Sequence, residues 1–114
     1  MPLKELPVIR ERGTFRALPD VDEDWAGRTS VLLKALADPT RLTMVAALWK
    51  AQQPICICDF TADLDLSQPT ISHHMAKLRE ADLVESDKQG IWVYYRLRSD
   101  LSPSTRKLLE RLIA

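Results

Sequence analysis

The sequence has little cysteine and little glycine, no long hydrophobic run, and no excess of charge of either sign. Its 114 residues include two cysteines, three glycines, and 16 basic residues balanced by 16 acidic ones. No apolar run reaches the roughly 18 residues of a membrane span, and the amino terminus has no signal-peptide core, so we expect a cytoplasmic protein without a membrane partner. In that reducing compartment, two cysteines indicate ligands or redox sensors rather than a structural disulfide. A net charge of zero neither requires nor excludes a polyanionic partner.

Length and composition predict one compact domain. Hydrophobic residues make up 46% of the chain and charged residues 28%, values typical of globular proteins. Residues 1–20 contain three prolines and four basic residues without a regular period. We therefore expect an amino-terminal arm over residues 1–20 and a single domain over residues 21–114.

Two capped helices open the predicted domain. The acidic run 22–24 suits the positive end of a helix, and apolar residues follow it at helical spacing from Trp25 to Leu36. Asp38 can cap the next helix, and Pro39 fits the first turn of that helix.

Two shorter apolar patterns follow Pro54. The first predicts a helix of about two turns that includes Ile57, Phe60 and Leu64. Ser67 then caps a fourth helix. The inward stripe of this helix consists of Ile71, Met75 and Leu78.

Residues 83–99 predict a β-hairpin, because apolar side chains alternate there with aromatic and basic ones. The turn is expected at residues 88–90. The predicted apolar face consists of Ile91, Val93, Tyr95 and Leu97. The opposite face consists of Trp92, Tyr94, Arg96 and Arg98.

A closing helix is predicted to begin at Ser102 and Pro103. Its apolar stripe consists of Leu108, Leu109, Leu112 and Ile113. A domain this small does not need the whole stripe for its own core, so we expect part of it to face a partner.

The order of these elements is that of a winged helix-turn-helix, a mainly α (α+β) fold with about five helices and a two-stranded wing. Small polar side chains near the start of the fourth helix can enter a major groove. A polar helix face is often merely solvated, but the aromatic and basic strand beside it favours DNA binding. The predicted DNA-contacting residues are Gln68, Thr70, Ser72, His73, Lys77, Arg79, Lys88, Tyr94, Arg96 and Arg98.

Three segments together resemble the bacterial ArsR/SmtB family of metal-responsive repressors: "LADPTRLTMVAAL", "ICICDF" and "LSQPTISHHMAKLREADLV". The resemblance covers roughly residues 27–100. It implies a homodimer, formed through the first and last helices, that represses its own resistance operon and leaves double-stranded operator DNA when a toxic metal or metalloid binds. Two recognition helices about 34 Å apart would read the two halves of an imperfect palindrome.

Cys56 and Cys58 predict a soft ligand, because thiolates prefer zinc, cadmium, lead, or trivalent arsenic and antimony. Tetrahedral sites usually need four ligands, whereas His73 belongs to the predicted DNA face and His74 is expected to be structural. The resemblance implies further cysteines in the arm for cadmium or lead sensors, and histidine and acidic pairs on the last helix for zinc sensors. Neither is present here.

Arsenic sensors of this family that place ligands in this segment have the pattern C-x-C-x-x-C, and the third cysteine falls on Thr61 here. The resemblance thus implies trivalent arsenic or antimony as inducer, inorganic or monomethylated, and no constitutive cofactor. The third arsenic bond could go to a small exogenous thiol or solvent, to the carbon of an organoarsenical such as methylarsenite, or to a cysteine of another chain.

The C-x-C spacing suggests how binding could release DNA. Residues i and i+2 point about 200° apart on a helix but share a side in extended backbone. If both cysteines lie on the third helix, metalloid binding competes with the winding of that helix and shifts the fourth helix.

The same residues allow other functional hypotheses. Oxidation or an electrophile could trigger release, although a disulfide across C-x-C is strained, and the cysteines could simply be small core residues. A thiol oxidoreductase usually has C-x-x-C at the head of a helix after a strand, and no strand is expected before Pro54, so we predict no enzyme. A winged helix that binds protein would show no salt-dependent affinity for duplex DNA.

Overall fold

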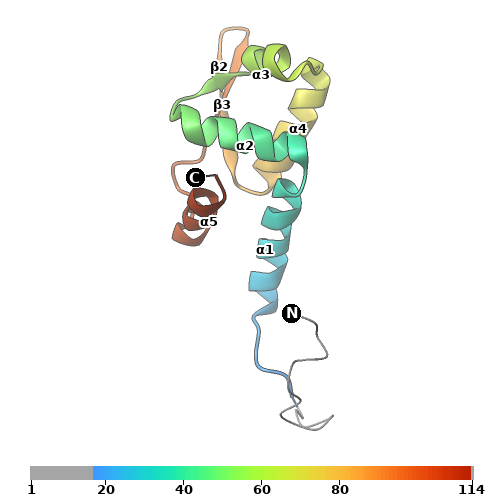
Figure 1. Ribbon diagram of the computed structural model, residues 1–114, viewed down its shortest axis with the longest axis vertical. Helices are drawn as coiled ribbons and strands as arrows, with labels where there is room; N and C mark the ends of the chain where they lie inside the picture. The colour runs from blue at the N-terminus through green and yellow to red at the C-terminus, as the bar shows by residue number, and fades with distance from the viewer. Residues whose placement is uncertain (1–16, 114) are drawn as a thin grey trace, which may run out of the picture.

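The computed structural model describes residues 17–113, arranged as a winged helix-turn-helix (Figure 1). The predicted arm over residues 1–20 therefore lies almost entirely outside the described residues. Within them, the elements in chain order are α1 (Glu23–Leu36), α2 (Pro39–Ala51), β1 (Ile55–Cys56), α3 (Ile57–Leu64), α4 (Gln68–Glu80), β2 (Val84–Gln89), β3 (Trp92–Leu97) and α5 (Pro103–Ile113). The predicted fold class is confirmed. Among residues 17–113, no helix has the length and apolar character needed to cross a membrane.

The helix caps predicted at Asp38 and Ser67 are confirmed. Each accepts a hydrogen bond from a backbone N–H in the first turn of α2 and α4, across 2.9 and 3.3 Å. Asp22, from the acidic run, caps α1 in the same way across 2.9 Å. At the other ends, Gln52 and Asp65 follow α2 and α3 with left-handed φ values of 55° and 53°. Caps at the helix starts and left-handed residues at the helix ends divide this part of the chain into short helices, and the chain turns sharply between them.

The sheet has three antiparallel strands in the order β1, β3, β2, so the prediction of a two-stranded wing is incomplete. The extra strand is β1, which pairs Ile55 with Tyr95 and Cys56 with Tyr94. Two residues are too few to show a strand period in sequence. This strand forms because the chain between α2 and α3 lies beside β3.

The wing turns later than predicted. Lys88 and Gln89 belong to β2, where they pair with Val93 and Trp92, and the turn consists of Gly90 and Ile91. A two-residue hairpin turn needs positive φ, which Gly90 supplies at 65°. The placement of Ile91 on the apolar face was therefore wrong, because its side chain is 83% exposed at the wing tip.

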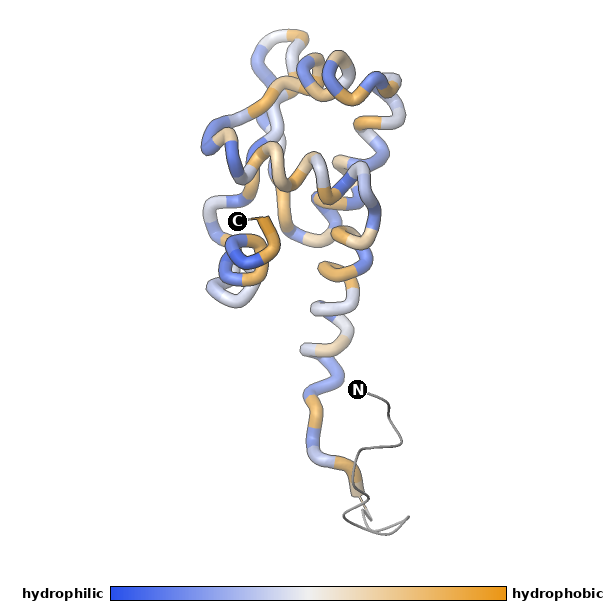
Figure 2. Tube along the Cα trace, viewed as in Figure 1, coloured by the Kyte–Doolittle hydropathy of each residue, from blue (hydrophilic) through white to orange (hydrophobic). Residues whose placement is uncertain are grey.

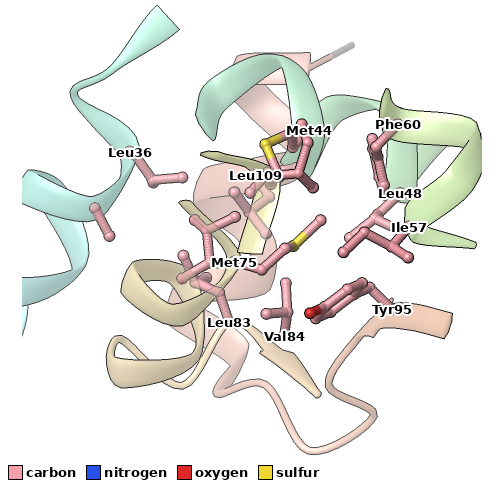
Figure 3. Packing of buried hydrophobic residues seen from close by; sticks show 14 of the residues in the cluster. Leu36, Met44, Leu48, Ile57, Phe60, Met75, Leu83, Val84, Tyr95 and Leu109 are labelled. Carbon is pink, nitrogen blue, oxygen red and sulfur yellow. The ribbon is translucent and has the colours of Figure 1, made fainter. Parts of the chain in front are cut away.

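The core lies where α2, α4 and α5 meet the start of the wing (Figure 3). The predicted stripe of α4 is confirmed, since Ile71, Met75 and Leu78 have no exposed surface. Met44 from α2 and Leu109 from α5 are equally buried. These contacts fix α4 with its opposite face outward.

Two helices keep apolar surface outside this core. α1 extends away from the rest of the domain (Figure 1), with apolar residues recurring along it (Figure 2). Trp25, Val31 and Leu33 on α1 are exposed, and so is Leu112 on α5.

Candidate DNA-binding surface and thiol site

The outward face of α4 carries the polar residues expected to read DNA. Gln68 and His73 are exposed, whereas Thr70 and Ser72 are half-buried. The Thr70 hydroxyl lies 2.8 Å from the Ser67 hydroxyl at the helix cap. Thr70 is thereby held at the first turn, the part of a recognition helix that usually meets base edges.

Three of the predicted basic residues have exposed partners nearby. Arg96 Nε donates to Glu85 Oε1 across 2.8 Å, Lys77 Nζ lies 3.9 Å from Glu80 Oε2, and Arg79 Nη2 donates to Ser86 Oγ across 3.1 Å. Such exposed pairs contribute little free energy. DNA phosphates could therefore replace these partners.

Arg98 is placed differently from the expectation of an outward phosphate contact. It follows β3, where its Nε and Nη2 donate to the two carboxylate oxygens of Asp100, each across 2.8 Å, and its Nη1 donates to Asp82 Oδ1 across 3.4 Å. The bonds to Asp100 raise the pKa of Arg98 and lower the pKa of Asp100. Its backbone N–H also donates to Leu83. Arg98 thus joins the base of the wing to the segment before β2.

Tyr94 is also less outward than expected. It is half-buried, packs against the core and lies opposite Cys56 across the β1–β3 pair. The exposed side chains of the wing include those of Lys88, Trp92 and Arg96, that of Ile91 at the tip, and those of Ser86, Asp87 and Gln89. The exposed apolar tip was missed because Ile91 is two positions before Val93 and so continues the alternating pattern in sequence. In the structure Ile91 lies in the turn, outside the strand.

The two cysteines lie at the junction of β1 and α3. Cys56 has extended backbone, with φ −68° and ψ 143°, and is the N-cap of α3. Its Sγ accepts a hydrogen bond from the backbone N–H of Cys58 across 3.3 Å. Cys56 is only 4% exposed, whereas Cys58 in the first helical turn is exposed.

This geometry corrects one expectation. Cys56 and Cys58 do not both lie within a helix, so their joint use does not require α3 to unwind. No strand precedes Pro54 among residues 17–113, as expected, but the two-residue strand β1 directly after Pro54 leads into α3. The spacing remains C-x-C rather than the C-x-x-C of thiol oxidoreductases.

The two thiols are close enough to influence each other. A side-chain hydrogen bond with Cys56 is the main cause that raises the pKa of the Cys58 thiol, and the negative charge of Asp59 adds to the effect. A raised pKa leaves less Cys58 thiolate at neutral pH, which slows oxidation.

The neighbourhood does not supply a third strong ligand. Thr61, at the position of the family's third cysteine, donates its hydroxyl to the carbonyl oxygen of Cys58 across 2.8 Å. Within residues 17–113, no group of three histidine, cysteine or acidic side chains is placed to hold a metal ion. His74 contacts Asp38 and Arg41 in α2, consistent with the expected structural role.

A groove of about 510 Å³ lies between α2 and α3. Its lining includes Ala47 from α2, Ile55 from β1, and Asp59, Phe60 and Leu64 along α3. Neither Cys56 nor Cys58 lines this groove.

Comparisons with known proteins agree with this architecture. Residues 38–86 match the family described as "Bacterial regulatory protein, arsR family". This match spans α2, α3, α4 and the start of β2, which is the part that holds both the cysteines and the outward face of α4.

Two curated relatives are arsenic regulators by name. The chain is 44% identical over 79 residues to the arsenical resistance operon repressor of Escherichia coli K12, a match that covers 69% of this chain and 67% of that protein. It is 37% identical over 83 residues to the arsenic resistance transcriptional regulator ArsR1 of Pseudomonas putida, which covers 73% of this chain and 64% of that protein. The chain thus spans about two thirds of the length of these relatives.

A solved structure supports the same fold. HlyU from Vibrio cholerae superposes with a TM-score of 0.67 and 33% sequence identity, over 80% of this chain and 97% of HlyU. The similarity therefore extends beyond the helix-turn-helix to nearly all of that regulator.

Proposed function

Because the chain belongs to the ArsR/SmtB family of helix-turn-helix transcriptional regulators, we propose that it is a repressor that binds operator DNA as a homodimer and is released by trivalent arsenic or antimony. The family is not enzymatic, so the chain is not an enzyme. The inducer binds Cys56 and Cys58. The observation that carries this proposal is the hydrogen bond from the backbone N–H of Cys58 to Cys56 Sγ, which holds the Cys56 sulfur against the first turn of α3, the turn that carries Cys58.

The DNA side of the proposal uses α4 and the wing. Gln68, Thr70, Ser72 and His73 meet base edges or adjacent phosphates from the outward face of α4. Phosphate contacts come from exposed basic residues at the end of α4 and along the wing, namely Lys77, Arg79, Lys88 and Arg96. We leave Arg98 out of this set because Asp100 and Asp82 already engage it, and half-buried Tyr94 is a minor contact at most.

The dimer side uses the apolar surface outside the core. Trp25, Val31 and Leu33 on α1 and Leu112 on α5 are exposed in the monomer. A second copy would cover these side chains, and burial of apolar area contributes roughly 25 cal/mol per Å². Pairing through α1 and α5 leaves α4 of each subunit available to one half-site of a palindrome.

The thiol pair suits a soft ion with three bonds. Cys58 is exposed and can capture the metalloid first, after which the buried Cys56 displaces a second oxygen ligand from it as water. The chain has no third cysteine, so the remaining bond goes to a hydroxide, a small thiol, the methyl carbon of methylarsenite or a cysteine of another chain.

Binding acts on DNA affinity through the cap of α3. Arsenic replaces the thiol proton of Cys56, and the Cys56 sulfur has to turn to share one arsenic atom with Cys58, which alters the hydrogen bond that this sulfur accepts from the Cys58 N–H at the first turn of α3. An N-cap is worth about 1 kcal/mol, close to the 1 to 3 kcal/mol that typically couples two sites. Since α3 packs on α4, the change reaches the recognition helix.

The decisive experiment titrates reduced protein on labelled operator with arsenite and, separately, with methylarsenite. Wild-type protein should release DNA, while Cys56→Ser and Cys58→Ser should bind the operator normally and stay bound. Serine is a good N-cap, so Cys56→Ser keeps the cap and isolates the loss of the sulfur ligand. Release of either serine variant at the wild-type arsenite concentration would contradict the proposal.

A thiol-redox or electrophile trigger is the alternative within the same fold. The exposure of Cys58 favours it, whereas the raised pKa of Cys58 opposes it. Release by peroxide but not by arsenite, with protein kept reduced in the arsenite arm, would replace the arsenic proposal with the redox one.

A further inference from the structure

One side chain joins three helices of the domain. Arg41, in the first turn of α2, donates from Nε to the carbonyl oxygen of Ala35 across 2.8 Å and from Nη2 to that of Lys34 across 3.3 Å. Its Nη1 lies 3.4 Å from Nδ1 of His74 in α4. The guanidinium thus contacts the end of α1 and the middle of α4 while its backbone belongs to α2.

The contact with α1 is a helix C-cap made by a side chain. Carbonyls in the last turn of a helix lack intrahelical partners, and the negative end of the helix dipole favours a cation there. The planar fork of Arg41 donates to two carbonyls of this turn at once, which fixes a direction as well as a distance. The Lys34 carbonyl also accepts the backbone N–H of Ala37 across 3.3 Å, whereas Arg41 is the partner of the Ala35 carbonyl. Arg41 thus helps to orient α1 against α2.

The contact with α4 involves two side chains at the start of α2, Asp38 and Arg41, which both lie against His74. Asp38 Oδ2 accepts the backbone N–H of Arg41 across 2.9 Å and lies 3.9 Å from His74 Nδ1. His74 therefore lies against both the carboxylate and the guanidinium of the α2 start. The next residue toward the helix start, His73, is on the outward face of α4, with its ring centroid 6.0 Å from that of His74.

These contacts join the two surfaces that a dimeric repressor needs to hold in register. α1 carries the exposed apolar residues assigned to the dimer, and α4 carries the face assigned to DNA. Resting on that proposed function, we infer that Arg41 is a positioning residue for operator recognition: by tying the end of α1 to α4, it sets the separation of the two recognition helices in the dimer.

A purely local stabilising role for Arg41 would lower stability and affinity for every duplex alike. A positioning role makes a different prediction, because one added base pair moves a half-site by about 3.4 Å along the helix and about 35° around it. A dimer with rigid α1–α4 geometry should reject such operators, whereas a loosened dimer should accept them. The ratio of affinities between native and altered half-site spacing is thus the diagnostic readout.

The experiment first selects a palindromic operator from random duplexes with the wild-type protein, then inserts or removes one central base pair. Wild-type affinity should fall at least about tenfold on altered spacing, the size of one poor base contact. Arg41→Gln removes the guanidinium that contacts both α1 and α4, so it should reduce this ratio to about threefold or less. Lys50→Ala removes a charge from the exposed end of the same helix and should leave the ratio unchanged.

Each outcome is informative. A folded Arg41→Gln dimer that keeps the wild-type ratio overturns the inference, and so does an equal loss in Lys50→Ala, which would assign the effect to charge. If Arg41→Gln does not fold, His74→Phe removes only the contact with α4 and should also lower the ratio; an unchanged ratio there overturns the inference. Wild-type protein that binds no duplex would instead refute the proposed function.

Discussion

Cys56 lies directly opposite Tyr94 in the antiparallel pairing of β1 with β3. The same cysteine caps α3, so one buried residue belongs to the wing sheet and to the helix-turn-helix at once. A ligand on its sulfur can therefore act on both parts of the proposed DNA-binding surface. This arrangement needs no long chain of intermediates between the sensor and the recognition helix.

The cap formed by Cys56 predicts unequal effects of removing the two thiols. Cys56→Ala removes the acceptor for the Cys58 N–H and leaves a small gap in the core, so it should lower the free energy of unfolding by about 1 kcal/mol. Cys58→Ala removes an exposed side chain and should leave stability within the error of a urea denaturation series. Equal losses in the two variants would show that the cap does not stabilise α3.

The N-cap of α2 predicts a specific acid sensitivity. The backbone N–H of Arg41, followed by the charges of Arg41 and His74, lowers the pKa of the Asp38 carboxyl below its ordinary 3.8. A carboxyl with a lower pKa in the folded state stabilises the fold above its unfolded pKa, and this contribution is lost as the pH falls through the folded pKa. Wild-type thermal stability should therefore decline below about pH 4, partly through Asp38.

Asp38→Asn isolates that contribution, because asparagine keeps a capping oxygen but does not titrate in this range. At neutral pH the variant should melt at a somewhat lower temperature than wild type, and the difference should shrink as the pH falls below about 4. Asp100, whose pKa is also lowered, is present in both proteins and cancels. A constant difference in melting temperature across this range would contradict the assignment.

The features that sequence reasoning found are those that a few neighbouring residues determine. Asp38 and Ser67 act through backbone N–H groups three residues away, so their caps could be predicted directly. The stripe of α4 could be predicted because its apolar residues recur at i, i+4 and i+7, the spacing of one helix face over about two turns.

The features that were missed depend on distant partners. β1 exists because β3, some forty positions later, lies beside it, and this pairing turned a predicted helical cysteine into a cap. Arg98 pairs with Asp82 across 16 positions, which no local pattern signals. The triple contact of Arg41 likewise requires α4 to return to α2. Sequence therefore located the thiol site, whereas its geometry needed the folded chain.

Two leucines of α5 are expected to have different roles, one in folding and the other in dimerisation. Leu109 has no exposed surface and Leu112 is 59% exposed, although both lie in the predicted apolar stripe of α5. Leu109→Ala should cost about 2 to 5 kcal/mol of unfolding free energy. Leu112→Glu should leave the monomer folded, by circular dichroism, but shift sedimentation equilibrium toward monomer. A Leu112→Glu protein that dimerises as tightly as wild type would place the dimer surface elsewhere.

The wing predicts which basic residues neutralise phosphates. Lys88 is exposed near the wing tip, whereas Arg98 has both carboxylate oxygens of Asp100 as partners. Each phosphate contact contributes about 0.9 to the slope of log affinity against log salt, so Lys88→Ala, which removes one contact per subunit, should reduce a dimer's slope by about 2. Arg98→Ala should leave the slope nearly unchanged while lowering the melting temperature, since it loosens the base of the wing.

Measuring operator affinity between 50 and 200 mM salt for both variants tests this assignment. The reverse order of slopes would mean that DNA draws Arg98 away from Asp100, and that the wing rearranges on binding.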